Sequence, residues 1–163
     1  MYSQDSLDIL TEVLDLESSS FVRYLHEVAQ LRAVRDGDTD ALALFARLYS
    51  ESSAGVAEFC ALLEGQVAVF PKIARDMDYA RYNFIRPVFL LAPLSEATRE
   101  HLEMLGKLAD ALGESGWEEG RQAVVRLIEN ESETLDQVES LSAKLGEAES
   151  EPPQRRGSSA SRW

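Results

Sequence analysis

The sequence predicts an all-α protein built as an antiparallel bundle of six or seven helices. Three observations lead to this prediction. Apolar residues recur every three or four positions along nearly the whole chain, which is the period of a helix with one buried face. Glycine and proline are sparse, with 9 and 5 among 163 residues. The alternation of apolar and polar residues that marks strands is absent from the sequence, so we expect no sheet.

The amino-terminal part of the chain predicts four helices. Polar residues at 5–6 are candidate caps of the first helix, and the serines at 18–20 end it. A second helix runs to an Asp-Gly-Asp turn, where Asp38 or Thr39 can cap a third. The polar cluster at 50–55 should break or bend the chain before a fourth. The apolar stripes of these helices contain Leu7, Leu10, Val13, Leu14, Phe21, Leu25, Val28, Leu31, Leu42, Phe45, Leu48, Tyr49, Val56, Phe59, Leu62, Leu63 and Val67.

The carboxyl-terminal part predicts three more helices. Pro71 is well placed as the first residue of a long aromatic helix, since the N–H that proline lacks is not needed there. Pro87 should kink or end that helix. Ser95 is the expected cap of the next helix, which ends at the turn 113–116 and leads into the last one. Their stripes contain Ile73, Met77, Tyr79, Tyr82, Phe84, Ile85, Val88, Phe89, Leu102, Leu105, Leu108, Leu112, Val124, Val125, Leu127, Ile128, Leu135, Val138, Leu141 and Leu145.

Composition and charge predict one acidic domain. The chain carries 16 Lys and Arg against 29 Asp and Glu, a formal charge of -13. We expect a folded helical domain over residues 1–149 and a disordered tail over 150–163, because the last residues are rich in serine, proline and arginine. Binding to a phosphate backbone depends on Lys and Arg, which an acidic body lacks. No direct nucleic-acid partner is therefore expected.

Three further features predict a cytoplasmic protein without a membrane partner. The longest apolar stretches are short and interrupted by charge, whereas a spanning helix needs about 20 apolar residues. The amino terminus is acidic, where a secretory signal would carry Lys or Arg before an apolar run. Cys60 is the single cysteine, so no internal disulfide can form, in agreement with a reducing compartment. Cys60 lies on an apolar face, where we expect packing rather than nucleophilic chemistry.

The sequence contains no motif that demands an enzyme. A di-iron carboxylate bundle needs Glu-x-x-His pairs, and neither His26 nor His101 has a glutamate three residues before it. Glu100 points about 100° away from His101 around a helix, so these two side chains cannot share an ion. Both histidines are interpreted as solvated or capping groups. Phosphate-binding glycine loops, nucleophile elbows and cysteine pairs are also absent, so no catalytic residue and no metal are assigned.

The segment Phe70–Phe89 has the most unusual composition. Arg75, Arg81 and Arg86 are interleaved there with aromatic residues, among them Tyr82. Arginine and aromatic side chains together can bind an anionic ligand with an apolar body, through forked hydrogen bonds and stacking. The alternative is a core helix whose arginines pair with the abundant glutamates. A pocket beside these residues would distinguish the two interpretations.

Three segments of the sequence carry a family resemblance. They are SLDILTEVLDLESSSFVRYL, GDTDALALFARLYSESSAGVAEFCALLEGQVAVFPKIA and GKLADALGESGWEEGRQAVVRLIENESETL. In this order they resemble the C-terminal ligand-sensing (FCD) domain of the FadR-type regulators in the GntR superfamily of transcription regulators. The resemblance implies a bundle of six or seven helices that forms a homodimer and holds an effector pocket inside the bundle.

The resemblance also implies which residues contact the effector. Many members place an Asp and three histidines around a metal, and at these positions this sequence has Glu58, Leu62, Leu105 and Ile128. No metal is therefore expected. Loss of the histidines is shared with the acyl-CoA-binding branch, and Tyr82 and Ser132 match two of its ligand contacts. Glu129 and Asp136 replace two others. The expected site for fatty acyl-CoA or a similar effector contains Arg75, Arg81, Tyr82, Arg86 and Ser132.

We therefore predict the ligand-sensing domain of a FadR-type transcription regulator, without a winged-helix DNA reader of its own. Two alternatives remain open. One is an acidic all-helical protein-interaction module without a small ligand, which a bundle lacking a cavity of about 300 Å³ beside Tyr82 and Arg86 would favour. The other is a ferritin-like di-iron protein, which stoichiometric iron in the purified protein would support.

Overall fold

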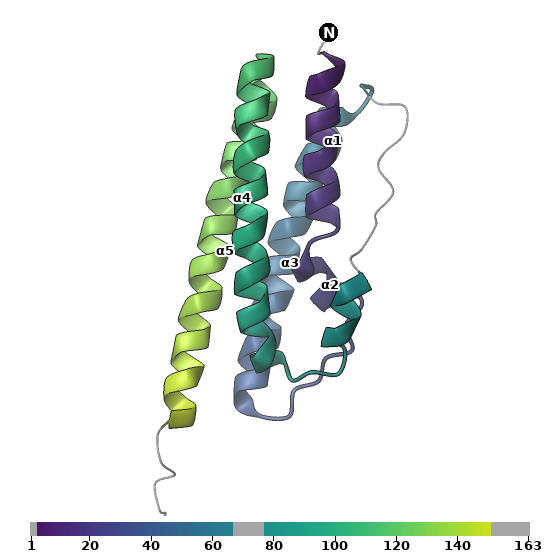
Figure 1. Ribbon diagram of the computed structural model, residues 1–163. Helices are drawn as coiled ribbons and strands as arrows, with labels where there is room; N and C mark the ends of the chain where they lie inside the picture. The colour runs from purple at the N-terminus through teal and green to yellow at the C-terminus, as the bar shows by residue number, and fades with distance from the viewer. Residues whose placement is uncertain (1–2, 67–76, 151–163) are drawn as a thin grey trace, which may run out of the picture.

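The computed structural model describes residues 3–66 and 77–150. These ranges contain five α-helices, two short 3-10 helices and no strand (Figure 1). The helices are α1 (Gln4–Ser18), α2 (Phe21–Glu27), α3 (Asp36–Leu63), η1 (Met77–Tyr82), η2 (Pro87–Leu90), α4 (Leu91–Ser115) and α5 (Glu118–Ser150). The all-α prediction is confirmed, whereas the count of six or seven helices and the FadR-type arrangement are not. The described helices include none that is long and apolar enough to cross a bilayer.

The four long helices α1, α3, α4 and α5 form a bundle (Figure 1). α1 packs against α3 and α4, and α5 packs against the same two helices. α1 and α5 run in one direction and α3 and α4 in the other, so packed neighbours are antiparallel (Figure 1). α3 and α4 point the same way, so the end of α3 and the start of α4 lie at opposite ends of the bundle, and residues 64–90 join them.

The apolar core is divided into two clusters by a layer of polar side chains. One cluster lies between α1 and the adjoining halves of the other long helices, and it is centred on Leu10, Phe59, Leu105, Leu112 and Val124. The other lies around α2 and η2, and it is centred on Phe21, Phe45, Leu90, Leu94 and Val138. Between the clusters each long helix buries a polar group, and these groups are Glu17, Ser52, Thr98 and Thr134.

Several predicted helix boundaries agree with the structure, and others are wrong. The serines at 18–20 separate α1 from α2, and Gly116 at φ +78° ends α4 before α5. The predicted break at 50–55 does not occur, because Ser52 is buried and Gly55 packs close to Glu17, so α3 continues through both. Small residues in a helix interior can thus serve close packing rather than a break.

The predicted caps also differ from those observed. Ser3 caps α1, with its Oγ accepting a hydrogen bond from the Ser6 N–H at 3.2 Å. Asp38 lies in the first turn of α3 and not at its cap. Ser95 lies inside α4, where its hydroxyl donates to Glu139 at 3.2 Å, because the helix begins four residues earlier, directly after η2. The preference of Ser and Asp for cap positions therefore does not decide which of several nearby residues begins a helix.

The long aromatic helix predicted from Pro71 is wrong in its described part. Met77–Tyr82 forms the 3-10 helix η1, and Pro87 opens η2 instead of ending a helix. Between them the chain turns at Phe84, whose φ of +64° is incompatible with a right-handed helix. Pro71 itself lies outside the described residues, as does the predicted tail beyond Ser150.

Candidate functional site: a polar layer in the bundle core

The residues predicted to bind acyl-CoA occupy separate places in the structure. Arg75 lies outside the described residues. The Nη2 of Arg81 donates to the Tyr82 hydroxyl at 2.8 Å, and the Tyr82 ring packs on Phe21 with ring centroids 5.0 Å apart. Ser132 is exposed on α5, and its hydroxyl donates to the Ile128 carbonyl at 2.7 Å. The structure therefore joins Arg81 to Tyr82 and leaves Ser132 apart.

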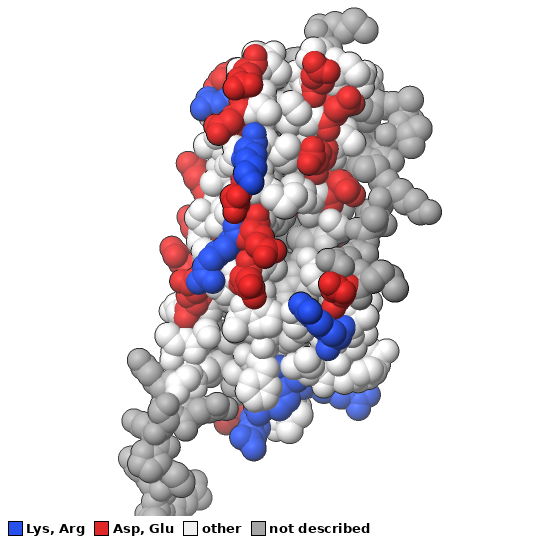
Figure 2. All heavy atoms as spheres, in the orientation of Figure 1, with Lys and Arg blue, Asp and Glu red and all other residues white. Residues whose placement is uncertain are grey.

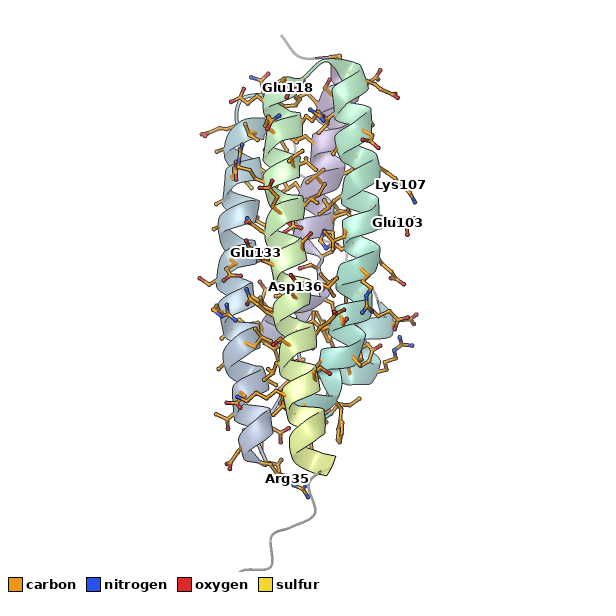
Figure 3. All side chains as sticks on the ribbon, turned by 90° about the vertical axis from the view of Figure 1, so that its left-hand side faces the viewer. Arg35, Glu103, Lys107, Glu118, Glu133 and Asp136 are labelled. Atoms are coloured by element: carbon orange, nitrogen blue, oxygen red, sulfur yellow. The ribbon has the colours of Figure 1, made fainter. Side chains whose placement is uncertain are left out.

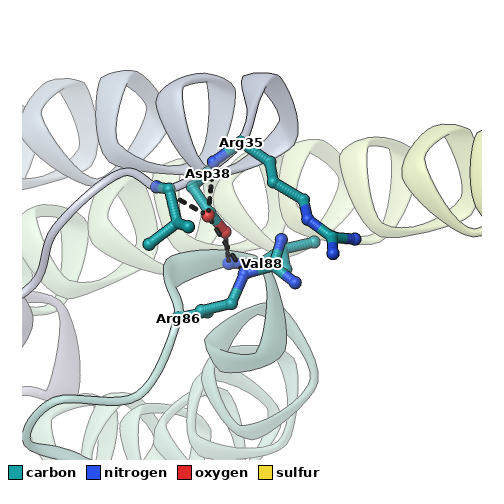
Figure 4. Close-up of polar contacts among 5 residues, drawn as sticks. Arg35, Asp38, Arg86 and Val88 are labelled. Carbon is teal, nitrogen blue, oxygen red and sulfur yellow. Dashed lines mark hydrogen bonds and ion pairs between the residues drawn. The ribbon is translucent and has the colours of Figure 1, made fainter.

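Arg86 is held by a buried aspartate (Figure 4). Its Nε donates to Asp38 Oδ2 at 3.1 Å, and the side chain of Asp38 has no exposed surface. The backbone N–H groups of Val34, Arg35 and Val88 donate to the same carboxylate at 3.0, 3.1 and 3.4 Å. Burial alone would raise the pKa of Asp38, but these donors, Arg86 foremost, lower it to about 2. Arg86 thus fastens η2 to α3.

The hollow beside Tyr82 is small and acidic. It measures about 210 Å³ and is lined by Arg81 together with Asp78, Glu96 and Glu100. Its lining does not include Arg86, and its volume is below the roughly 300 Å³ expected of a ligand site. An anionic effector would meet three carboxylates in this hollow.

The positions that the resemblance assigned to a metal are mostly apolar core. Leu105 is buried, and Leu62 and Ile128 are partly buried in the same cluster. Glu58 is exposed and pairs with Arg126 across to α5. Cys60 is partly buried against this cluster, as its apolar position in the sequence indicated.

The most unusual chemistry lies in the polar layer, which contains Glu17 from α1, His101 from α4 and Glu131 from α5. Glu17 is completely buried, and its Oε1 lies 2.9 Å from Nε2 of His101, whose side chain is 11% exposed. Among the described residues, Glu17 Oε2 has no hydrogen-bond partner. It lies 3.9 Å from the point where a Cβ on Gly55 would be, so the absent side chain of this glycine leaves room for the carboxylate.

Burial and neighbouring charges shift the pKa values of His101 and Glu131. Burial would lower the pKa of His101, but the contact with Glu17 and the charges of Glu17 and Glu131 raise it. Burial raises the pKa of Glu131, and the charges of Glu17 and Glu51 add to this effect while His101 opposes it, so that the pKa reaches about 7. The layer thus places two carboxyl groups, Glu17 and Glu131, beside a single imidazole.

Two hollows meet at Glu131. The larger measures about 120 Å³, and its walls include His101, the aromatic rings of Phe21 and Tyr79, and Met104 at an exposed position. The smaller measures about 30 Å³ and is lined by polar residues that include Glu51, Ser52 and Thr134. Glu131 borders both, so a molecule in the larger hollow would contact a carboxylate, an imidazole and two aromatic rings.

Sequence inspection missed this layer, although a signal was present. Glu17 lies three residues after Leu14, and Glu131 lies seven residues from both Val124 and Val138, so each occupies an apolar stripe. A charged residue on a buried helix face is informative because charges are rarely buried without a partner. The interpretation of His101 as a solvated or capping group is wrong, because this imidazole is buried against Glu17.

His26, in contrast, is exposed and stacks on Tyr49 with ring centroids 4.1 Å apart. Its predicted solvated position is confirmed. Comparison with known proteins adds no relative, since no family model, curated protein or solved structure matches this chain.

Proposed function

We propose that this chain is a non-enzymatic ligand-binding protein whose ligand is a small organic cation held beside Glu131 and His101. The observation that carries this proposal is the fully buried Glu17 carboxylate, next to a second carboxyl group and a hollow with aromatic walls. Two acidic groups face one imidazole, so a positive charge brought into the layer would be stabilised by the excess negative charge. Aromatic rings attract organic cations through their faces.

The hollow limits the size of the ligand. A volume of about 120 Å³ corresponds to roughly four water molecules at about 30 Å³ each. This suits an alkylammonium ion with a few carbon atoms. The acyl chain of a fatty acyl-CoA is too long for this hollow, and the phosphates of the CoA part would be repelled by the carboxylates of Glu100 and Glu131. A small amine is therefore the better match.

A sensing role, as the FadR-type resemblance implies, is supported by the position of the layer. Glu17, His101 and Glu131 come from three different helices, and the hollows reach α2 and α3 as well. A ligand that prefers one packing of these helices shifts the population toward that packing. We further propose that the protein acts in the cytoplasm and does not contact nucleic acid directly, on the basis of its acidic charge and its acidic amino terminus.

Calorimetric titration with small alkylammonium salts tests the proposal. We expect the wild type to bind a short alkylammonium ion, and Glu131→Gln to weaken binding at least tenfold, since a hydrogen bond to a charge contributes about 1.5–3 kcal/mol. Glu133→Gln is the matched control, because Glu133 is exposed on the same helix (Figure 3). Absence of heat with every amine would refute the proposal. Binding of long-chain acyl-CoA by the wild type, but not by Tyr82→Ala, would restore the acyl-CoA prediction.

Metal binding is a second candidate, favoured by the connectivity. One long crossover between two parallel helices is the arrangement of ferritin-like bundles, whose metal ligands are Glu and His side chains in the core. In the described ranges, however, no three Asp, Glu, His or Cys side chains converge closely enough to hold an ion. Metal analysis of the purified protein decides this candidate: stoichiometric iron, lost in Glu17→Gln, would support it, and its absence would refute it.

A further inference from the structure

Large apolar side chains are exposed at one end of the bundle. The described residues include five exposed large apolar side chains, and four of them lie in the connection before α3 or between η1 and the start of α4. Val34 is 70% exposed, Phe84 78% and Phe89 55%. The two segments are held together because the N–H groups of Val34 and Val88 donate to the same Asp38 carboxylate (Figure 4).

Phe84 is held in the exposed position by an anchored turn. Its φ of +64° is rarely adopted by a bulky residue and is strained. Before Phe84 in the chain, Asn83 Oδ1 accepts a hydrogen bond from the Tyr24 hydroxyl at 2.7 Å. After it, Arg86 is held by Asp38. The surrounding contacts thus impose a strained conformation that directs an aromatic ring to solvent, and such strain is characteristic of interaction sites.

Arginines accompany these apolar side chains. Arg32 and Arg35 are exposed in the connection before α3, and Arg81 is exposed in η1. The guanidinium of Arg86 lies 5.0 Å from the centre of the Phe89 ring. Acidic side chains are interspersed, notably Asp36 and Asp78, but basic side chains predominate at the lower end of the face in Figure 2. We call this set the basal surface, and it comprises Val28, Arg32, Val34, Arg35, Arg81, Phe84, Arg86 and Phe89.

The sequence that follows α5 is basic. α5 ends at Ser150, at the same end of the bundle as the basal surface (Figure 1). The sequence that follows contains three arginines, one glutamate and a tryptophan.

We propose that the basal surface docks on an anionic lipid bilayer. Aromatic and arginine side chains suit the boundary of a membrane, where rings enter the headgroup region and guanidinium groups bind phosphates. An acidic peptide is the less suitable partner, because it offers no apolar region in which the exposed rings of Phe84 and Phe89 could be buried. The inference is independent of the amine site and departs from the sequence expectation of no membrane partner.

Vesicle co-sedimentation of the full chain tests this inference. At low salt we expect binding to vesicles that contain phosphatidylglycerol, weaker binding to phosphatidylcholine vesicles, and loss of binding as salt screens the charges. Replacing both Phe84 and Phe89 with alanine should weaken binding by about tenfold or more, the effect of exposing one buried aromatic ring. Replacing both with tryptophan should preserve binding, since tryptophan favours the membrane interface.

Charge variants complete the test. Arg35→Gln combined with Arg81→Gln should weaken binding to the anionic vesicles, whereas Lys107→Gln, an exposed cation on α4 (Figure 3), should not. Circular dichroism spectra and melting curves confirm that each variant is folded. The proposal is overturned if the wild type does not bind anionic vesicles at low salt, or if the alanine pair binds them equally well. Binding to polyglutamate without binding to vesicles would also overturn it, in favour of an acidic protein partner.

Discussion

Replacing Asp38 with asparagine should destabilise the bundle by about 2 kcal/mol at neutral pH. This carboxylate accepts hydrogen bonds from the Arg86 guanidinium and from three backbone N–H groups, and it is completely shielded from water. Asparagine has nearly the same shape but no charge, and its amide nitrogen would face donors instead of accepting from them. The variant should therefore loosen the attachment of η2 to the start of α3.

The magnitude follows from the pKa of Asp38. Its value falls from 3.8 to about 2 in the folded protein, and a tenfold change in an ionisation constant corresponds to about 1.4 kcal/mol. Because the folded-state value is the lower one, this stabilisation is fully present above pH 3.8 and is lost as the pH falls through 2. At pH 3 roughly half of it should remain. The wild type and the variant should thus approach each other in stability as the solution is acidified.

Urea unfolding followed by circular dichroism, at pH values between 7 and 3, measures this difference. Asp40→Asn is the matched control, since Asp40 is exposed two residues further along α3, and its effect should stay within about 0.5 kcal/mol. An unchanged midpoint for Asp38→Asn at neutral pH would show that the carboxylate does not hold η2. A difference that stays constant down to pH 3 would show that ionisation of Asp38 is not its source.

Three other predictions concern the polar layer, the turn between α4 and α5, and the apolar core. The pKa of Glu131 is raised from 4.5 to about 7, so its contribution to the free energy of unfolding is present below pH 4.5 and falls by about 3 kcal/mol as the pH rises through 7. Glu131→Gln should reduce this dependence of stability on pH in urea unfolding. An unchanged pH dependence would show that Glu131 is not its source. Gly116→Ala should lower stability by about 1 kcal/mol, because this turn residue has a φ of +78°, and an unchanged melting temperature would contradict it. Phe59→Ala should cost about 3–5 kcal/mol, because Phe59 is 1% exposed in the apolar cluster that α1, α3, α4 and α5 share. A loss below about 1 kcal/mol in urea unfolding would show that the cluster repacks.

Part of the candidate site was accessible from the sequence. Glu17, His101 and Glu131 each interrupt or accompany an apolar stripe, so their burial could have been predicted from helical spacing. The proximity of these three side chains could not be predicted, because it depends on which helices are neighbours and on how far each is shifted along the bundle axis. The expected site at Arg81, Tyr82 and Arg86 shows the converse: closeness in sequence did not place these side chains around a common pocket, since Arg86 turned to Asp38.

The sequence by itself determined that this protein is helical and where α1 and α4 end. Apolar spacing, the serines at 18–20 and the glycine at 116 act through local backbone geometry, which neighbouring residues dictate. The tertiary structure decided that α3 continues without a break across residues 50–55, that Asp38 joins η2 to α3, and that Glu17 contacts His101. These features depend on desolvation and on contacts between distant segments, and such energies arise only once the helices have packed.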